Sequence, residues 1–555
     1  MRNFIRLGVT PFVVCPGSRS QALALAAAQL EKSNEAVLTV RIDERSAGFL
    51  ALGSAVETGV PAVVITTSGT AVAELMPSVL ESHHSGVPMI LLTADRPTEL
   101  RGIGSNQTTD QLAVFSKFVR LARDISVPST GGLSESFLES LAAEAIGAAT
   151  GRSGSPGPVQ LNLGFREPLS GELRPNDHAV ERKLAIGPAT NSIAATALQR
   201  EPGTVVIAGH GSGAKAEEFA RTIGAPLLAE VSSGARFGPN LVVSYRELLR
   251  DQAFGGMVKR AIVFGHPTLS REVPKLLERS DVETIIIRGN TAEAFNPGRR
   301  AAKVVESVEA VGELGDWADP WVAKWVFASR ELNSTFSVFD PEASRTDDSR
   351  TVSRHGRAQL EVFRERITRK LLVESVWQKT WPHDRLVFAS SRLIRVADSV
   401  VTGKRITVHS NRGLAGIDGN NATAIGIAIA SQGGLVGSTA ANSIAGMTRL
   451  VTGDLAFLHD VGSLLFPIGE SKPRIQIIVG NDNGGSLFDE LEVAGTADRD
   501  SFDRVIFTPH DAKIAALSGA YGWEHRLVRN RGELDEALSL TEGQVVIEAV
   551  LERDQ

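Results

Sequence analysis

Short, almost entirely apolar runs alternate with helical segments along most of the chain. In the first part these runs are "FVVC", "VLTVRI", "AVVITT", "MILLTAD" and "VQLNL", each bounded by turn residues. Strands that are apolar on both faces, with helices between them, are typical of parallel sheets covered by helices on both sides. The pattern therefore predicts an α/β protein made of doubly wound parallel sheets.

Two polar stretches divide this pattern into three blocks. One lies at about 170–188, and the other, at 334–356, has the composition of an exposed linker. The second block carries "TVVIAG", "PLLAEV", "AIVFG" and "TIIIRG", and the third carries "RLVFAS", "ITVHS", "TRLVTGD", "IQIIVGN" and "VVIEAVL". A chain of 555 residues is long enough for about three domains. We predict domains at 1–175, 190–333 and 357–555.

Composition argues against several classes of function. The net charge of −6 gives no electrostatic reason to expect nucleic acid or an acidic membrane as a partner. The single cysteine, Cys15, excludes an intrachain disulfide and fits a reducing compartment. It lies in an apolar strand, so we expect a buried side chain. No apolar run approaches the roughly 18 residues of a membrane span, and we expect a cytoplasmic protein.

In open parallel sheets, ligands bind where strands end and helices begin. The first block has three such junctions of interest, "CPGSRS", "RIDERSAGF" and "TTSGTAV". Glycine and small hydroxyl residues there leave backbone N–H groups available to anions. Each junction taken alone also fits a simple helix cap or a solvated side chain.

The second block contains a possible dinucleotide fingerprint. "GHGSGA" follows a predicted strand and matches G-x-G-x-x-A through Gly209, Gly211 and Ala214, and Glu230 stands where a ribose-binding acid is expected. Glycines at this spacing suit any tight turn from strand to helix. Nicotinamide or flavin binding is therefore kept as an alternative.

The third block places oxygen ligands after two successive strands. Asp454 follows a strand and Gly453, and Asn481, Asp482 and Gly484 follow the next strand. The separation is long enough for one crossover helix and a return to the neighbouring strand. Each turn alone fits a helix cap, but carboxylates that meet at one sheet edge are suitable ligands for Mg²⁺. The pair predicts a metal site.

This Gly-Asp followed by an Asn-rich turn resembles the diphosphate and metal motif of thiamine diphosphate enzymes. That family has a pyrimidine-binding, a central and a diphosphate-binding domain, in the order predicted above. The chain is most similar to the menaquinone-pathway branch, which joins 2-oxoglutarate to isochorismate. The matching segments span the chain: "PGSRS" (16–20), "DERSAGF" (43–49), "TSGTAVAEL" (67–75), "LLTADRP" (91–97), "SNQTTDQ" (105–111), "SNRGLAGIDG" (410–419), "GDL" (453–455) and "NDNGG" (481–485).

The resemblance implies thiamine diphosphate as cofactor, with Mg²⁺ or Mn²⁺. The family's catalytic glutamate, which hydrogen-bonds the cofactor's pyrimidine ring, matches Glu44. The implied cofactor-binding residues are Glu44, Ser390, Ser391, Ile417, Gly453, Asp454, Leu455 and Asp482. The implied metal ligands are Asp454, Asp482 and Gly484. Asp482 stands where the family has asparagine, and Asn481 is the alternative ligand. The family builds each site between two subunits, which implies a homodimer or homotetramer.

The resemblance also explains the arginines at the junctions. Both implied substrates carry two carboxylates, which the planar fork of arginine binds well. Isochorismate is assigned to Ser18, Arg19, Arg96, Asn106 and Gln107, and 2-oxoglutarate to Ser391, Arg395 and Arg412. Gln107, Arg395 and Arg412 join Glu44 as implied catalytic residues of a decarboxylating transferase. The alternatives are a carboligase of the acetohydroxyacid synthase type, a scaffolding relative without activity, and a flavin or nicotinamide oxidoreductase.

Overall fold

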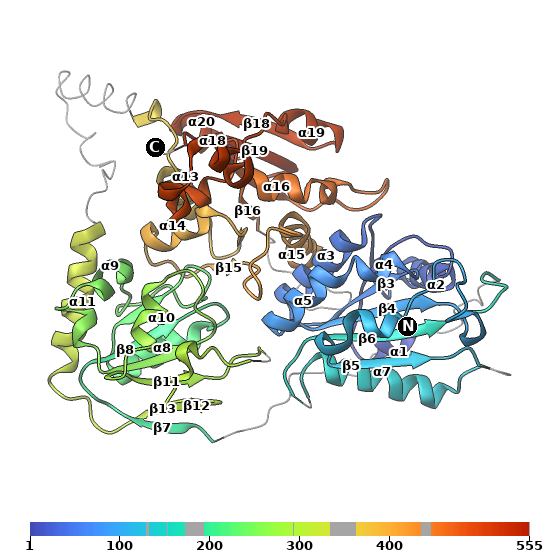
Figure 1. Ribbon diagram of the computed structural model, residues 1–555, viewed down its shortest axis with the longest axis horizontal. Coiled ribbons are helices and arrows are strands. Elements are labelled where there is room, and N and C mark those ends of the chain that lie inside the picture. Colours follow the sequence, from blue (N-terminus) through green and yellow to red (C-terminus); the bar gives the residue numbers. More distant parts are fainter. Residues whose placement is uncertain are drawn as a thin grey trace.

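The structure is a computed structural model that describes residues 1–128, 132–152, 154–171, 194–291, 293–333, 362–433 and 446–553. These residues form three α/β lobes in chain order, coloured blue, green and orange to red in Figure 1. Each lobe has a parallel sheet with buried apolar clusters on its faces, which confirms the predicted fold class. The predicted linker 334–356 and most of 170–188 lie outside the described residues, so the exact domain limits stay a prediction.

The first sheet has the strand order β2-β1-β3-β4-β6-β5, and all its described pairs are parallel. The strands are β1 (Pro11–Val14), β2 (Val37–Val40), β3 (Ala62–Thr66), β4 (Met89–Asp95), β5 (Leu121–Ile125) and β6 (Pro158–Gly164). The helices are α1 (Arg2–Arg6), α2 (Gln21–Lys32), α3 (Glu44–Thr58), α4 (Thr70–Ala73), α5 (Met76–Ser85), α6 (Gln111–Phe115) and α7 (Glu135–Ala149). Every residue of β1, β3 and β4 is buried, because these strands are covered by helices. Cys15 is buried as predicted.

The third sheet repeats this topology with the order β15-β14-β16-β17-β19-β18. Its strands are β14 (Arg385–Phe388), β15 (Thr407–His409), β16 (Thr448–Gly453), β17 (Ile475–Asn481), β18 (Glu524–Val528) and β19 (Gln544–Val550). The helices are α13 (Arg369–Lys379), α14 (Arg392–Val400), α15 (Asn420–Gly433), α16 (Asp454–His459), α17 (Val493–Thr496), α18 (Arg499–Phe502), α19 (Ile514–Ala520) and α20 (Arg531–Leu538).

The central sheet is smaller, with the order β12-β11-β10-β8-β9, and β7 and β13 form a separate parallel pair. Its strands are β7 (Thr196–Gln199), β8 (Thr204–Ala208), β9 (Leu227–Ala229), β10 (Arg260–Phe264), β11 (Glu283–Ile287), β12 (Lys303–Val305) and β13 (Val308–Val311). The helices are α8 (Ala214–Ile223), α9 (Tyr245–Arg250), α10 (Glu272–Leu277) and α11 (Ala318–Asn333). In the part of the chain that the structure describes, no helix is both long and apolar enough to cross a bilayer.

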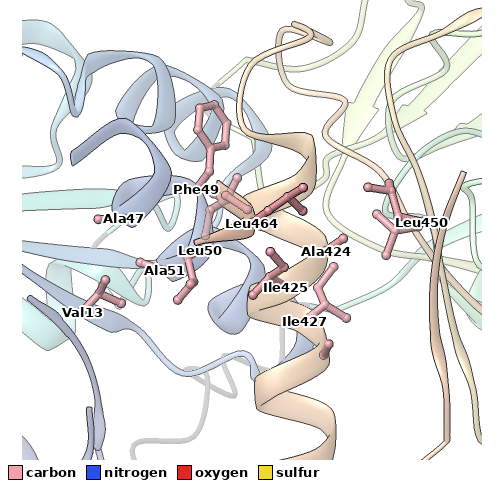
Figure 2. Packing of buried hydrophobic residues seen from close by; sticks show 14 of the residues in the cluster. Val13, Ala47, Phe49, Leu50, Ala51, Ala424, Ile425, Ile427, Leu450 and Leu464 are labelled. Carbon is pink, nitrogen blue, oxygen red and sulfur yellow. The ribbon is translucent and has the colours of Figure 1, made fainter. Parts of the chain in front are cut away.

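Helices α3 and α15 pack side by side and join the first domain to the third (Figure 2). Two glycines allow the close approach, because a Cβ on Gly53 would lie 2.1 Å from the Thr423 carbonyl oxygen and one on Gly426 would lie 2.1 Å from that of Leu50. Phe49 and Ile425 belong to one apolar cluster shared by the two domains. The start of α3 is therefore held against the third domain of the same chain.

Candidate active site

The third-domain residues predicted to bind cofactor and metal line one cavity at the carboxyl edge of the third sheet. They are Ser390, Ser391, Ile417, Gly453, Asp454, Leu455, Asp482 and Gly484. The cavity lies where β14 and β16 end, and these neighbours flank the position at which the strand order reverses. Parallel α/β sheets bind ligands at this position. The structure therefore brings this set of sequence-predicted residues together.

Asp454 is buried at the start of α16, and its carboxylate is aimed at the next strand end. Its Oδ1 accepts from the Leu455 N–H at 2.7 Å, and its Oδ2 accepts from the Gly484 N–H at 2.9 Å and lies 3.2 Å from His510 Nε2. Burial, and after it the charge of Asp482, raises the pKa of the Asp454 carboxyl. Two like charges this close in a buried site favour a bound cation.

Asp482 has protein partners of its own. Its Oδ2 accepts from Arg369 Nη2 at 2.6 Å and from the Ser486 hydroxyl at 2.5 Å. Both members of the Arg369–Asp482 ion pair are buried. Arg369 also lines the cavity. Sequence reasoning missed Arg369 because it stands at the start of α13, far from any motif, and nothing in its local sequence points to Asp482.

Two further side chains shape the cavity. The Ser390 hydroxyl is buried and has no hydrogen-bond partner within the described residues. Ile417 is 40% exposed, which is unusual for a large apolar side chain at the edge of a core. A buried hydroxyl and an exposed isoleucine on the same cavity wall are suited to a ligand that has a polar and an apolar part.

Glu44 lies in the first domain, at the first position of α3. Asp43 caps the helix by accepting from the N–H groups of Arg45 and Ser46, so the sequence "IDERS" fixes where the helix begins. Burial raises the pKa of the Glu44 carboxyl above its ordinary value. The residues that line the third-domain cavity include none from the described part of the first domain. One chain therefore does not place Glu44 in that cavity.

Two arginines meet at the carboxyl edge of the first sheet. Arg96, at the end of β4, is buried and donates to the Ser68 hydroxyl and to the Gln107 carbonyl at 3.1 Å. Arg19, after β1, donates to the Phe165 carbonyl at 3.1 Å, and its Nε is buried without a partner in the described residues. Burial, followed by the nearby charge of Arg19, lowers the pKa of Arg96. The two guanidiniums therefore give this part of the edge a local positive charge that is suited to an anion.

The other residues assigned to the first edge surround these arginines. Gln107 has a positive φ of 59° and donates from Nε2 to the Ser68 carbonyl at 2.8 Å. Ser18 and Asn106 are exposed. Ser68 accepts hydrogen bonds from both Arg96 and Gln107. It lies in one of the quoted motifs, but no role was assigned to it from sequence. Its place at the end of β3, between β1 and β4, is the feature that identifies it.

Arg395 and Arg412 lie near the boundary between the third and central domains. Arg412 is buried and donates from Nε to the Thr268 hydroxyl at 2.8 Å. Arg395 is exposed on α14. Burial lowers the pKa of the Arg412 guanidinium, and a smaller contribution to the lowering comes from the charge of Arg395. The two cations are therefore close enough to repel each other, as two arginines facing one anionic ligand would be.

The possible dinucleotide site in the central domain is closed. His210 and His266 exchange backbone hydrogen bonds of 3.0 and 2.9 Å, which tie together the loops after β8 and β10. These strands flank the position where the order reverses, so the bonds cover the crevice a dinucleotide would use. Glu230 is buried and accepts from the N–H groups of Thr268 and Leu269. The glycines thus form a structural turn, and the geometry does not favour the alternative.

Comparisons with known proteins agree with this geometry. Residues 4–114 match the family model described as "Thiamine pyrophosphate enzyme, N-terminal TPP binding domain". Three curated relatives are named 2-succinyl-5-enolpyruvyl-6-hydroxy-3-cyclohexene-1-carboxylate synthase. The protein from Leifsonia xyli subsp. xyli is 53% identical over 577 residues, which cover 100% of this chain and 95% of the relative.

The relative from Clavibacter michiganensis subsp. michiganensis is 50% identical over 97% of this chain and 92% of its own length. The relative from Renibacterium salmoninarum is 40% identical over 99% of this chain and 92% of its own length. Because such relatives align over nearly the whole of both sequences, the chain belongs to the 2-succinyl-5-enolpyruvyl-6-hydroxy-3-cyclohexene-1-carboxylate synthase family of thiamine pyrophosphate enzymes.

Proposed function

We propose that this chain catalyses the thiamine diphosphate-dependent decarboxylation of 2-oxoglutarate and the transfer of the remaining four-carbon unit to isochorismate. The products are 2-succinyl-5-enolpyruvyl-6-hydroxy-3-cyclohexene-1-carboxylate and CO₂, in menaquinone biosynthesis. The main support for this proposal is the third-domain cavity, which is lined by all the residues of that domain that were predicted from sequence to bind cofactor and metal. The family membership supports the same reaction. We also expect a cytoplasmic location.

The cavity residues fit a diphosphate held by Mg²⁺ or Mn²⁺. Asp454, Asp482 and the Gly484 carbonyl would hold the ion, since buried, mutually repelling carboxylates bind a hard cation well. The described residues contain no group of three or more His, Cys, Asp or Glu side chains placed to hold a metal. The remaining ligands would therefore be oxygens of the cofactor and water. Ser390, Ser391 and Leu455 would contact the diphosphate end, and Ile417 would support the rings.

When bound, thiamine diphosphate supplies a carbon nucleophile for attack on a 2-oxo group. Glu44 would hold a hydrogen bond at the pyrimidine ring, a role that its raised pKa supports because a carboxyl that holds a proton can exchange it. Arg395 and Arg412 would bind the carboxylates of 2-oxoglutarate. Ser18, Arg19, Arg96, Asn106 and Gln107 would hold isochorismate. The proximity of Arg19 and Arg96 supports the binding of a dicarboxylate at the first edge.

Because the cavity contains no described residue of the first domain, we propose that Glu44 acts in the site of a second subunit. The protein would then be a homodimer or homotetramer with its active sites between subunits. Each site would take the diphosphate edge from one chain and the arginine edge from the other. An isolated chain would have both parts but no complete site.

The reaction is tested by incubating the protein with thiamine diphosphate and Mg²⁺. Isochorismate should disappear only when 2-oxoglutarate is present. Replacing 2-oxoglutarate by pyruvate tests the acetohydroxyacid synthase alternative, and consumption of pyruvate instead would favour it. Failure to consume isochorismate in the complete mixture would contradict the proposed function.

The shared site is tested by mixing two inactive variants, Glu44→Gln and Asp454→Ala. A mixed dimer would have two different sites. One would combine the native Glu44 of one chain with the native Asp454 of the other, and the second site would carry both substitutions. Activity should therefore return after the subunits are exchanged by dilution and reconcentration. If each site lies within one chain, every site in the mixture keeps one defect and activity stays absent.

A further inference from the structure

Arg412 owes its orientation to a residue of another domain. It lies in the loop between β15 and α15, and its guanidinium is buried. Its Nε donates to the Thr268 hydroxyl at 2.8 Å and its Nη2 to the Thr268 carbonyl at 3.4 Å. Thr268 lies in the central domain, between β10 and α10. The position of Thr268 therefore decides where the guanidinium points.

Glu230 holds the Thr268 peptide in place. One of its oxygens, Oε1, accepts from the N–H groups of both Thr268 and Leu269 at 2.7 Å. Glu230 follows β9 and is 1% exposed, so water does not compete for these bonds. Hydrogen bonds to a carboxylate are among the stronger ones in proteins. The turn that receives Arg412 is therefore fixed by a buried side chain that does not itself hydrogen-bond the guanidinium.

Glu81 fixes the loop on the other side of Arg412. It belongs to α5 of the first domain and is 3% exposed. Its Oε1 accepts from the Gly413 N–H at 2.7 Å and its Oε2 from the Leu414 N–H at 2.8 Å. Gly413 permits this contact, because a Cβ there would lie 2.9 Å from the Glu81 carbonyl oxygen. The loop is thus tied to the first domain immediately after Arg412.

We propose that Glu81, Glu230 and Thr268 are positioning residues that aim the Arg412 guanidinium at the donor carboxylate. All three domains would then contribute to the placement of one arginine. The inference rests on the proposed function for the role of Arg412. It goes beyond it by giving Glu230, the residue in the dinucleotide-like position, and Glu81 a share in donor binding. A purely structural role for these residues would affect folding but would not act through Arg412.

Thr268 provides the sharpest variants, because Thr268→Val removes the hydroxyl with little change of shape. We expect the KM for 2-oxoglutarate to rise about tenfold or more, with the KM for isochorismate nearly unchanged. Thr268→Ser keeps the acceptor and should behave as the wild type. The matched control is Thr284→Val in β11, a buried threonine of the same domain whose hydroxyl has no partner in the described residues. Equal KM values for Thr268→Val and wild type would overturn the inference.

A double-mutant cycle separates positioning from a structural role. In an Arg412→Met background, Thr268→Val should add no further loss, because the guanidinium that it positions is gone. If Thr268→Val raises the KM for 2-oxoglutarate by the same factor with and without Arg412, the inference is overturned. Glu230→Gln keeps the oxygen that accepts both N–H groups and should be mild, whereas Glu230→Leu should resemble Thr268→Val. If Glu230→Leu does not fold, the Thr268 variants still decide the question.

Binding of glutarate to the holoenzyme, measured by calorimetry, distinguishes this inference from the proposed function. Glutarate has two carboxylates and no 2-oxo group, so it cannot be decarboxylated. We expect its affinity to fall about tenfold or more in Thr268→Val and in Arg412→Met. If the enzyme does not consume isochorismate but glutarate binding follows this pattern, the proposed function fails and the positioning role stands. Glutarate binding that is indifferent to both variants would overturn the positioning role.

Discussion

The first and third sheets have the same strand order, but different charged side chains follow their strands. At or next to the reversal of the order, Arg19 and Arg96 follow strands β1 and β4 of the first sheet, which makes this its basic edge, and Asp454 and Asp482 follow β16 and β17 of the third, which makes this its acidic edge. The topology explains why both edges have a site, because ligands of parallel sheets bind at this position. The side chains at the strand ends then decide which ligand fits. The first edge is suited to carboxylates and the third to a cation with a diphosphate.

The central sheet shows that such an edge is not always open. Its β8 and β10 flank a similar reversal of order, but backbone bonds between His210 and His266 close it. Glu230, at the end of β9, holds a turn of its own domain. The central domain therefore contributes to the active site through Thr268 and not through its own crevice. We therefore expect substitutions at the three edges to have different effects.

The largest effect is expected at the acidic edge. Asp454→Ala should abolish Mg²⁺-dependent binding of thiamine diphosphate and lower activity by orders of magnitude, because it removes the buried carboxylate that we propose as a metal ligand. Calorimetric titration of the cofactor measures this. The control is Asp500→Ala, an exposed carboxylate of α18. Cofactor affinity within a few-fold of wild type in Asp454→Ala would show that the metal site lies elsewhere.

Asp482, the other acid of that edge, should have a smaller effect, and on stability. Asp482→Asn removes the negative charge from the buried ion pair with Arg369. Breaking a buried pair from one side is destabilising by about 3 kcal/mol or more. We therefore expect lower stability to urea in the absence of cofactor and metal, and recovery of most of the loss in the double variant Asp482→Asn/Arg369→Met. Unchanged stability of Asp482→Asn would show that the pair contributes little to the fold.

Burial explains which parts of the fold were predictable from sequence. The buried strands β3, β4 and β17 were identified from their apolar runs, because both of their faces are covered. The strands β5 and β18 were missed. They lie at sheet edges, and "LARDI" and "EHRLV" carry polar side chains that remain partly exposed. These two edge strands lack the continuous apolar run that marks β3, β4 and β17.

The candidate site divides in the same way. Asp454 could be named from sequence because its motif and its place at a strand end both point to it, whereas Arg96 was named through the resemblance. Arg369, Thr268 and His510 could not be named from sequence, since each acts through one contact made by a distant part of the chain. From sequence, the prediction that Glu44 and Asp454 meet from different subunits rested on the resemblance. Spacing along one chain does not show which copy supplies a residue.

The basic edge should respond to geometry as well as charge. Arg19→Lys keeps the charge but replaces a planar fork with a single ammonium, which binds a carboxylate less well. We expect the KM for isochorismate to rise about tenfold, with little change for 2-oxoglutarate. Steady-state titration of each substrate measures this, and Arg123→Lys, in a partly exposed pair with Glu144, is the control. A higher KM for 2-oxoglutarate, with that for isochorismate unchanged, would mean that Arg19 binds 2-oxoglutarate and that the two substrate assignments are reversed.

The smallest effect concerns a carboxylate of the third domain that lies away from the edge. Glu374 is buried in α13, and its Oε1 has no partner among the described residues. Burial raises the pKa of its carboxyl from 4.5 to about 7, against the opposing charges of Lys370 and Arg531. The folded protein thus favours the protonated form. The stability that Glu374 contributes is complete below the unfolded pKa and is lost as the pH rises through the folded one.

Glu374→Gln, which is neutral at every pH, should therefore be more stable than wild type at about pH 8 and nearly equal to it at about pH 4.5. Urea unfolding midpoints across this range measure the difference, which should grow up to about pH 7 and then level off. Cofactor affinity should not change, because Glu374 does not line the cavity. A loss of cofactor binding would mean that an acid away from the sheet edge also belongs to the site. A constant stability difference at all pH values would show that the carboxyl does not titrate with folding.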